Sequence, residues 1–400
     1  MIEITQLDHN GRGIGKINNK IAFIENSLPG EVVDIKITKE KKNFIEGEVI
    51  KYIKLSNKRV ESTCPYFNKC GGCDLLHISY EESLKFKKEK IQNIINRYLN
   101  KDININNIVE CDNNFYYRNK TTFQVKENIG FYKNKTYDII PIDKCLISSK
   151  LINDSIKYLK KLELKYINKI ICKTSNNQLM IIIETNKDNL NINCIKNIAT
   201  SIYIKNNNNY TLVHGEKYII EEVDNFKYLV SPDSFFQINI DICTKLYSKI
   251  KEYVGTNNNI LDLYCGTGSI SIFVSEKNNV LGVEINEYAI NDAKENAKLN
   301  NIKNINFICG ESGKIINNID FNPDVIIVDP PRSGLSRETI DNIFKSKSKK
   351  LIYVSCDPMT LVRDLNILEA EYNIIELTPF DMFPNTKHVE CLCYLLRKDI

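Results

Sequence analysis

Hydrophobic and polar positions follow three different patterns along this 400-residue chain. Residues 2–55 hold short β-type runs of about five to eight residues separated by glycine-containing turns, which predicts a small all-β barrel. Residues 80–99 place apolar side chains at helical spacing, which predicts an amphipathic helix whose Lys and Glu residues face solvent. Residues 115–240 mix strand-like runs with a short helix and predict an α+β domain.

The last third of the chain alternates strands and helices regularly. Strand-like runs include NILDL, NVLGVE, NINFIC, DVIIV and KKLIYVS, and a hairpin ends the chain. This order predicts a parallel, doubly wound α/β sheet whose ligand site lies at the carboxyl ends of its strands. Together the patterns predict three domains, over residues 1–56, 57–235 and 236–400.

Composition and charge narrow the class of protein. The chain is 42% hydrophobic and 26% charged, as in ordinary globular proteins, which excludes collagen-like, mucin-like and disordered chains. No apolar run reaches the ~18 residues that span a bilayer, so we expect a cytoplasmic protein without a membrane partner. Nothing in the sequence fixes the oligomeric state, and a monomer is the default expectation. Residues 1–165 hold 29 Lys and Arg against 21 Asp and Glu, which indicates a polyanionic partner or a fluctuation in a Lys-rich chain.

Three of the thirteen cysteines form a compact cluster. Cys64, Cys70 and Cys73 have the spacing C-x5-C-x2-C, with two glycines that let the backbone wrap closely around a bound group. In a protein without a disulfide scaffold, this spacing predicts a metal centre. Cys145 is the best candidate for a fourth ligand, and Cys111 competes with it. Four thiolates suit zinc as well as iron–sulfur, but the single C-x2-C pair favours a 4Fe–4S cluster.

A second candidate site lies in the α/β region. The glycine turn that begins at Tyr264 follows the first strand and lets the backbone approach a cofactor closely. Glu284 ends the next strand, where a carboxylate can accept both hydroxyls of a ribose. This pattern admits either NAD or S-adenosylmethionine.

Two later loops add reactive side chains at the same edge. The loops that contain Asp329 and Cys356 end adjacent strands, and Glu390 lies in the last hairpin. A thiol, carboxylates and a nucleoside site together fit C5 methylation of a pyrimidine. Thiolate addition to C6 makes C5 nucleophilic, and a base must then remove the C5 proton.

The sequence resembles a known family at several motifs. The stretch GRGIGKINNKIAFIENSLPGEVVDIKI resembles a TRAM domain, an OB-like RNA-binding barrel. The cysteine cluster and the motifs SFFQIN, LDLYCGTG, DPPRSG, SCDP and FPNTKHVE resemble those of the RNA uracil-C5 methyltransferases. The resemblance implies a multidomain protein with a TRAM barrel, an α+β middle domain with a metal cluster, and a Rossmann-like class I methyltransferase domain.

The resemblance also implies roles for individual residues. The enzyme would methylate C5 of a uridine in 23S rRNA, or alternatively in tRNA, with S-adenosylmethionine as donor. Cys356 would be the nucleophile and Glu390 the base, and Asp357 departs from the Asn that many members carry. The remaining implied residues are the 4Fe–4S ligands Cys64, Cys70, Cys73 and Cys145, and the cofactor-binding Gln237, Tyr264, Glu284, Glu311 and Asp329.

Two other classes of function remain open at this point. One is a methyltransferase of the same fold that acts on cytosine or DNA, against which the RNA-type barrel argues. The other is a non-catalytic RNA-binding or ribosome-assembly factor. The presence of Cys356, Asp329 and Glu390 together argues against a protein that only binds RNA.

Overall fold

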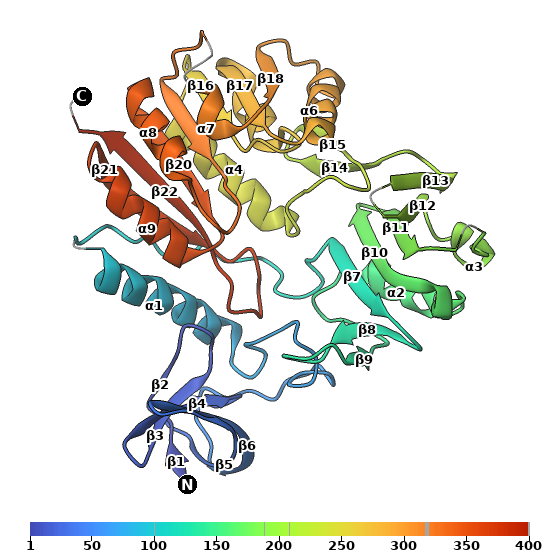
Figure 1. The fold of residues 1–400 in the computed structure, drawn as a ribbon, viewed down its shortest axis with the longest axis vertical. Helices are drawn as coiled ribbons and strands as arrows, with labels where there is room; N and C mark the ends of the chain where they lie inside the picture. Colours follow the sequence, from blue (N-terminus) through green and yellow to red (C-terminus); the bar gives the residue numbers. More distant parts are fainter. Residues whose placement is uncertain (100, 188, 208, 317–319, 399–400) are drawn as a thin grey trace.

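The computed structural model describes residues 1–400 except 100, 188, 208, 317–319 and 399–400. Figure 1 shows three lobes: a small β-barrel at the N-terminus, a middle lobe built on one sheet, and a larger α/β lobe that ends the chain. None of the helices in this described part is long and apolar enough to cross a membrane.

The N-terminal lobe is the expected barrel. Its six strands have the order β1-β5-β6-β4-β3-β2, and Ile2, Ala22, Ile24, Val33 and Ile45 fill its core. The inward residues alternate with exposed ones, as the strand pattern predicts. The strands are β1 (Ile2–Glu3), β2 (Gln6–Leu7), β3 (Gly13–Ile17), β4 (Lys20–Glu25), β5 (Val32–Glu40) and β6 (Phe44–Lys54).

The middle lobe is a mixed seven-stranded sheet in the order β13-β12-β11-β10-β7-β8-β9, with a separate hairpin β14–β15. Helices α2 and α3 pack against one face of this sheet, and their apolar side chains form a hydrophobic core with those of the strands. Its strands are β7 (Lys120–Val125), β8 (Ile129–Tyr132), β9 (Ile139–Pro141), β10 (Ile167–Ser175), β11 (Gln178–Thr185), β12 (Ser201–Asn206), β13 (Asn209–Gly215), β14 (Ile219–Val223) and β15 (Phe226–Val230). Its helices are α2 (Lys150–Leu159), the 3₁₀ turn η1 (Leu164–Tyr166) and α3 (Asn193–Lys196).

The C-terminal lobe holds the expected doubly wound sheet, in the order β18-β17-β16-β19-β20-β22-β21. The first five of these strands are parallel, and β22 and β21 add an antiparallel edge. The strands are β16 (Asn259–Leu263), β17 (Asn279–Glu284), β18 (Ile305–Cys309), β19 (Val325–Val328), β20 (Lys350–Ser355), β21 (Tyr372–Phe380) and β22 (Glu390–Arg397). The helices are α4 (Ile240–Val254), α5 (Ser269–Val274), η2 (Ser275–Lys277), α6 (Glu287–Leu299), α7 (Ser312–Ile315), α8 (Arg337–Ser346) and α9 (Pro358–Leu368).

Helix α1 (Tyr80–Tyr98) connects the barrel to the C-terminal lobe (Figure 1). It begins where the Ser79 side chain accepts a hydrogen bond from the backbone N–H of Glu82, a standard N-cap. Its apolar residues Ile91, Ile94 and Ile95 join the core of the C-terminal lobe, although α1 belongs to the segment expected in the middle domain.

Candidate active site

The glycine turn and Glu284 meet at the carboxyl ends of β16 and β17. The backbone N–H of Gly266 donates to Glu284 Oε2 at 3.2 Å, and the N–H of Asn286 donates to Oε1 at 2.9 Å. Tyr264 has the left-handed φ of 64° as the chain turns away from the strand, and burial raises the pKa of its hydroxyl. The backbone of the glycine turn and the Glu284 carboxylate therefore lie together at the carboxyl ends of β16 and β17, as the sequence pattern predicts.

Gly268 explains why this turn needs glycine. Its φ is 76°, and a Cβ there would lie 2.7 Å from the ring of Phe307. A side chain at this position would force the helix away from the sheet. Glycine therefore lets α5 start directly against β17 and β18.

Of the three remaining expected cofactor residues, Glu311 lies at the same edge of the sheet as Glu284, whereas Gln237 lies further away. Glu311 follows β18 and forms an ion pair with Lys314 at 2.7 Å, so it lies at the same sheet edge as Glu284. Gln237 is 7% exposed and lies just before α4, and its backbone carbonyl accepts from the Asn119 side chain at 3.1 Å. Gln237 therefore lies at the junction between the middle and C-terminal lobes.

Cys356 and Glu390 come together through strand register. Ser355 of β20 pairs with Cys391 of the antiparallel β22, so Cys356 and Glu390 occupy the next position along the two strands. Asp329 follows β19, which runs parallel to β20 on its other side. A thiol and two carboxylates from three neighbouring strands thus lie at one edge.

Burial and the charges of neighbouring groups shift the pKa values of Cys356, Asp329 and Glu390. Glu390 is 3% exposed, and burial raises its pKa well above the usual range, with the Asp329 carboxylate raising it further. Burial also raises the pKa of Asp329, to about 7. The pKa of the Cys356 thiol is raised to about 11, first by burial and then by Glu390, while Arg332 lowers it. Two carboxylates that resist ionisation beside a thiol form a site suited to proton transfer.

The residue after the thiol has a structural role. The Asp357 side chain accepts from the backbone N–H groups of Met359 and Thr360 and thereby caps α9, and Pro358 occupies the first helical turn. Asp and Asn are equally good N-caps. Asp357 in place of the common Asn therefore preserves the start of this helix.

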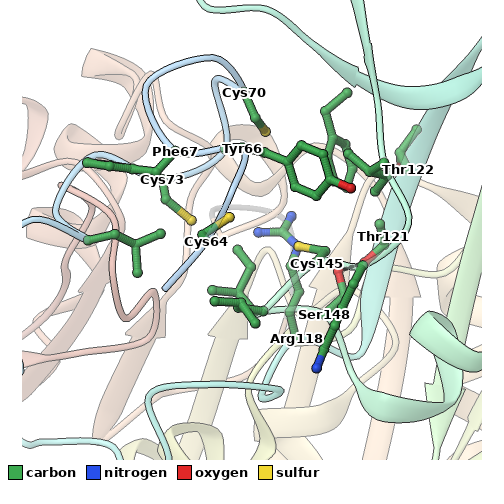
Figure 2. Close-up of a pocket in the computed structure, with 17 residues that line it drawn as sticks. Cys64, Tyr66, Phe67, Cys70, Cys73, Arg118, Thr121, Thr122, Cys145 and Ser148 are labelled. Carbon is green, nitrogen blue, oxygen red and sulfur yellow. Dashed lines mark hydrogen bonds between the residues drawn. The ribbon is translucent and has the colours of Figure 1, made fainter. Parts of the chain in front are cut away.

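The four predicted metal ligands line one cavity of about 230 Å³. Figure 2 shows Cys64, Cys70, Cys73 and Cys145 around it, with Arg118 reaching in from the middle lobe. The competing candidate, Cys111, lies elsewhere, and its thiol donates to the backbone carbonyl of Asn113 at 3.0 Å. Of the two candidates for the fourth position, only Cys145 shares the cavity with the other three thiols.

Burial disfavours the charged form of three of these thiols. It raises the pKa of Cys64, that of Cys70 to about 11 and that of Cys73 well above its ordinary value, and the neighbouring thiols raise all three further. Within the described residues, no three Cys, His, Asp or Glu side chains converge closely enough to hold a single metal ion. The iron–sulfur cluster stays a prediction at this point.

One buried charge was not predicted from the sequence pattern. Lys87 belongs to the Lys- and Glu-rich run expected to face solvent, yet it is 0% exposed and forms an ion pair with Asp381, which is also fully buried. Helical spacing could have found it, because Lys87 lies four residues before Ile91 on the apolar face of α1. The partner Asp381 is far away in sequence and carries no such signal.

This fold and site define a class of protein: a Rossmann-like methyltransferase with an appended RNA-type barrel. Residues 79–398 match the family model described as tRNA (Uracil-5-)-methyltransferase, and residues 1–50 match the TRAM domain. An uncharacterized RNA methyltransferase of Clostridium tetani is 36% identical over 97% of this chain and 94% of its own length. Another, from Clostridium acetobutylicum, is 36% identical over 100% of this chain and 97% of its own.

A solved structure covers the whole architecture. The tRNA (uracil-54, C5)-methyltransferase of Pyrococcus abyssi, in complex with S-adenosyl-L-homocysteine, is 28% identical, with a TM-score of 0.83 over 99% of both chains. The chain belongs to the tRNA (uracil-5-)-methyltransferase family and is an RNA methyltransferase. The expected family and the TRAM domain are confirmed.

Proposed function

We propose that this enzyme transfers a methyl group from S-adenosylmethionine to C5 of a uridine in RNA, with Cys356 as nucleophile and Glu390 as base. The register of β20 and β22, which puts these two side chains next to each other beside Asp329, carries the proposal. A thiol adjacent to a carboxylate is what addition to a pyrimidine followed by proton removal requires.

The reaction runs in three steps. The target base leaves its stack, and the Cys356 thiolate forms a bond to C6, which makes C5 an enolate carbon. C5 then attacks the methyl group of the donor, and S-adenosylhomocysteine leaves. Finally Glu390 removes the C5 proton, and the bond between C6 and sulfur breaks. Only the ionised form of Glu390 can accept this proton, and the raised pKa makes that form a stronger base than an exposed carboxylate.

Trapping of the covalent intermediate tests this mechanism. Cys356→Ala should bind RNA and S-adenosylhomocysteine yet transfer no methyl group and form no adduct. Glu390→Gln should add, methylate and then stall, so that an RNA–protein adduct survives denaturing electrophoresis. Wild-type enzyme should stall likewise on 5-fluorouridine RNA, because fluorine cannot leave as a cation. An adduct formed by Cys356→Ala would overturn the mechanism, and so would methylation by this variant at near wild-type rate.

For the cofactor, we propose that Tyr264, Glu284, Glu311, Gln237 and Asp329 bind S-adenosylmethionine. Glu284 suits the ribose, since its oxygens already accept from two backbone N–H groups that fix the carboxylate at the strand end. Glu311 lies at the same edge and is assigned to the adenine. Support comes from the Pyrococcus abyssi relative, which binds S-adenosyl-L-homocysteine.

For the cavity in the middle lobe, we propose a 4Fe–4S cluster on Cys64, Cys70, Cys73 and Cys145. The support is that all four thiols line one cavity, from segments far apart in the sequence. A 4Fe–4S cluster takes four cysteine thiolates as its ligands, which matches this number of thiols. Its iron would supply the positive charge that the thiolates need.

RNA would reach Cys356 along a groove of about 840 Å³ between the barrel and α1, which extends to Met359. The groove is lined by the basic and aromatic side chains of Arg12, Phe23, Lys90 and Arg97. Acidic side chains also line it, and some of them form ion pairs with the basic side chains, as Asp8 does with Arg12. Basic and aromatic side chains bind RNA phosphates and bases. Removal of residues 1–56 should weaken RNA binding and flatten its salt dependence, and equal binding at every salt concentration would contradict this role.

We propose 23S rRNA in the cytoplasm as the substrate, as the family resemblance implies. A tRNA is the second candidate, favoured by the activity of the Pyrococcus abyssi relative. Mapping of C5-methyluridine in rRNA and tRNA of a deletion strain separates the two. We further propose the division at residues 56 and 235, with α1 attached to the C-terminal lobe by its packing.

A further inference from the structure

The loop over residues 381–389 leads directly to the proposed base. Phe380, the last residue of β21, pairs with Glu390, the first residue of β22, so both ends of the loop lie side by side. Cys356, in contrast, follows β20 and lies outside this loop. A shift of the loop would therefore move Glu390 more than Cys356.

Helix α1 holds the beginning of this loop through a buried charge. Lys87 Nζ donates to Asp381 Oδ1 and, at 2.9 Å, to the backbone carbonyl of Phe383. The Tyr80 hydroxyl, on the same face of the helix, donates to Asp381 Oδ2 at 2.8 Å. Lys87 and Asp381 are both 0% exposed. Both carboxylate oxygens of Asp381 are thus bound by one helix.

The same helix also holds the far end of the loop. Lys90 Nζ donates to the backbone carbonyl of Lys387 at 2.9 Å, three residues before Glu390. Within the loop, the Phe383 carbonyl that accepts from Lys87 also accepts from the N–H and the hydroxyl of Thr386. Lys87 therefore holds both Asp381, the first residue of the loop, and the turn between Phe383 and Thr386.

A buried ion pair is weak support for stability alone. Taking both charges from water costs several kcal/mol per ion, and an apolar pair of similar volume is often as stable. The pair instead fixes the position of the loop, because the charge-assisted hydrogen bonds from the lysine hold the carboxylate and the backbone carbonyl in one place. A fixed position matters here because the loop leads directly to the proposed base.

We propose that Lys87 is a positioning residue, which through Asp381 and the Phe383 carbonyl holds Glu390 where it can remove the C5 proton. This inference rests on the proposed role of Glu390. It requires that disruption of the pair slows proton removal while thiol addition and methyl transfer, which use Cys356 and the donor, continue.

The test measures the covalent RNA–protein adduct and turnover in the same reactions with S-adenosylmethionine. Lys87→Met alone would leave Asp381 as an unpaired buried charge, so the main variant is Lys87→Met with Asp381→Asn, which removes both charges. Tyr80→Phe is a milder second variant. Lys88→Met is the matched control, because Lys88 lies on the same helix but donates to Asn107 instead.

In the double variant we expect turnover to fall roughly tenfold to hundredfold, as a misplacement of about 1 Å can cause. The adduct should accumulate, and the affinity for S-adenosylhomocysteine should stay unchanged. Tyr80→Phe should shift in the same direction by less, and Lys88→Met should match wild type. A purely structural role would lower adduct and turnover together, and this result would overturn the inference, as would unchanged turnover.

Glu390→Gln serves as the reference that separates the two proposals. If Glu390→Gln accumulates adduct while neither the double variant nor a folded Tyr80→Phe does, the positioning role is wrong and the proposed mechanism stands. If Glu390→Gln forms no adduct, both are wrong.

Discussion

Arg332 is the cation that opposes the burial of the Cys356 thiol. Both its positive charge and a hydrogen bond from its side chain lower the pKa of Cys356, whereas burial, Glu390 and Asp329 raise it. The net result is a pKa of about 11. Reactivity of this thiol should therefore depend on pH and on Arg332.

Alkylation of Cys356 by iodoacetamide measures that dependence. The thiolate is the reactive form, so the rate should rise about tenfold per pH unit between pH 7 and 9, below the pKa. Arg332→Gln should slow the reaction roughly threefold to tenfold at pH 8, since the pKa rises further. Peptide mass spectrometry follows Cys356 separately from the other thiols. A faster reaction in Arg332→Gln would contradict this account.

Glu284→Gln should weaken binding of S-adenosylhomocysteine. The amide keeps the shape but has only one accepting oxygen, so it cannot serve both backbone N–H groups and two ribose hydroxyls. We expect a loss of roughly tenfold in affinity, or about 1.4 kcal/mol, by isothermal titration calorimetry. Glu287→Gln, in the first turn of α6, is the control and should bind as wild type. If Glu284→Gln bound S-adenosylhomocysteine as tightly as Glu287→Gln, Glu284 would not be a cofactor-binding residue.

The sequence allowed prediction of the elements but of only part of their arrangement. Period-two and helical patterns located the barrel and the parallel strands, because local burial determines both. The proximity of Cys356 and Glu390 depends on antiparallel pairing of β22 with β20, which joins distant segments. The docking of α1 on the C-terminal lobe and the pairing of Lys87 with Asp381 also depend on long-range contacts, which periodicity does not report.

Iron content distinguishes the two candidates for the fourth cluster ligand. Protein purified anaerobically should hold about four irons per chain. Cys145→Ser should lose most of this iron, because Cys145 lines the cavity with the other three thiols. Cys111→Ser is the matched control and should keep it, since Cys111 is bound to Asn113 elsewhere. Stoichiometric zinc with negligible iron in the wild type would contradict the cluster.

Asp262 should make the fold less stable as pH rises. It is 1% exposed in the first strand of the parallel sheet, and Ser271 Oγ donates to its Oδ2 at 2.5 Å. Its Oδ1 has no hydrogen-bond partner among the described residues. Burial raises its pKa to about 7, whereas an unfolded chain has about 3.9. The folded state therefore favours the protonated form, and stability that is complete below about pH 4 declines until the pH passes about 7.

Asp262→Asn removes this ionisation while it keeps the shape of the side chain and a group that can accept from Ser271. The variant should gain stability over wild type, by roughly 2–4 kcal/mol at pH 8 and clearly less at pH 5, since the penalty grows with ionisation. Urea unfolding at both pH values measures the difference. Asp341→Asn, at an exposed position of α8, is the control and should change little at either pH. A gain that is equal at pH 5 and pH 8 would mean that the buried carboxylate is not the cause.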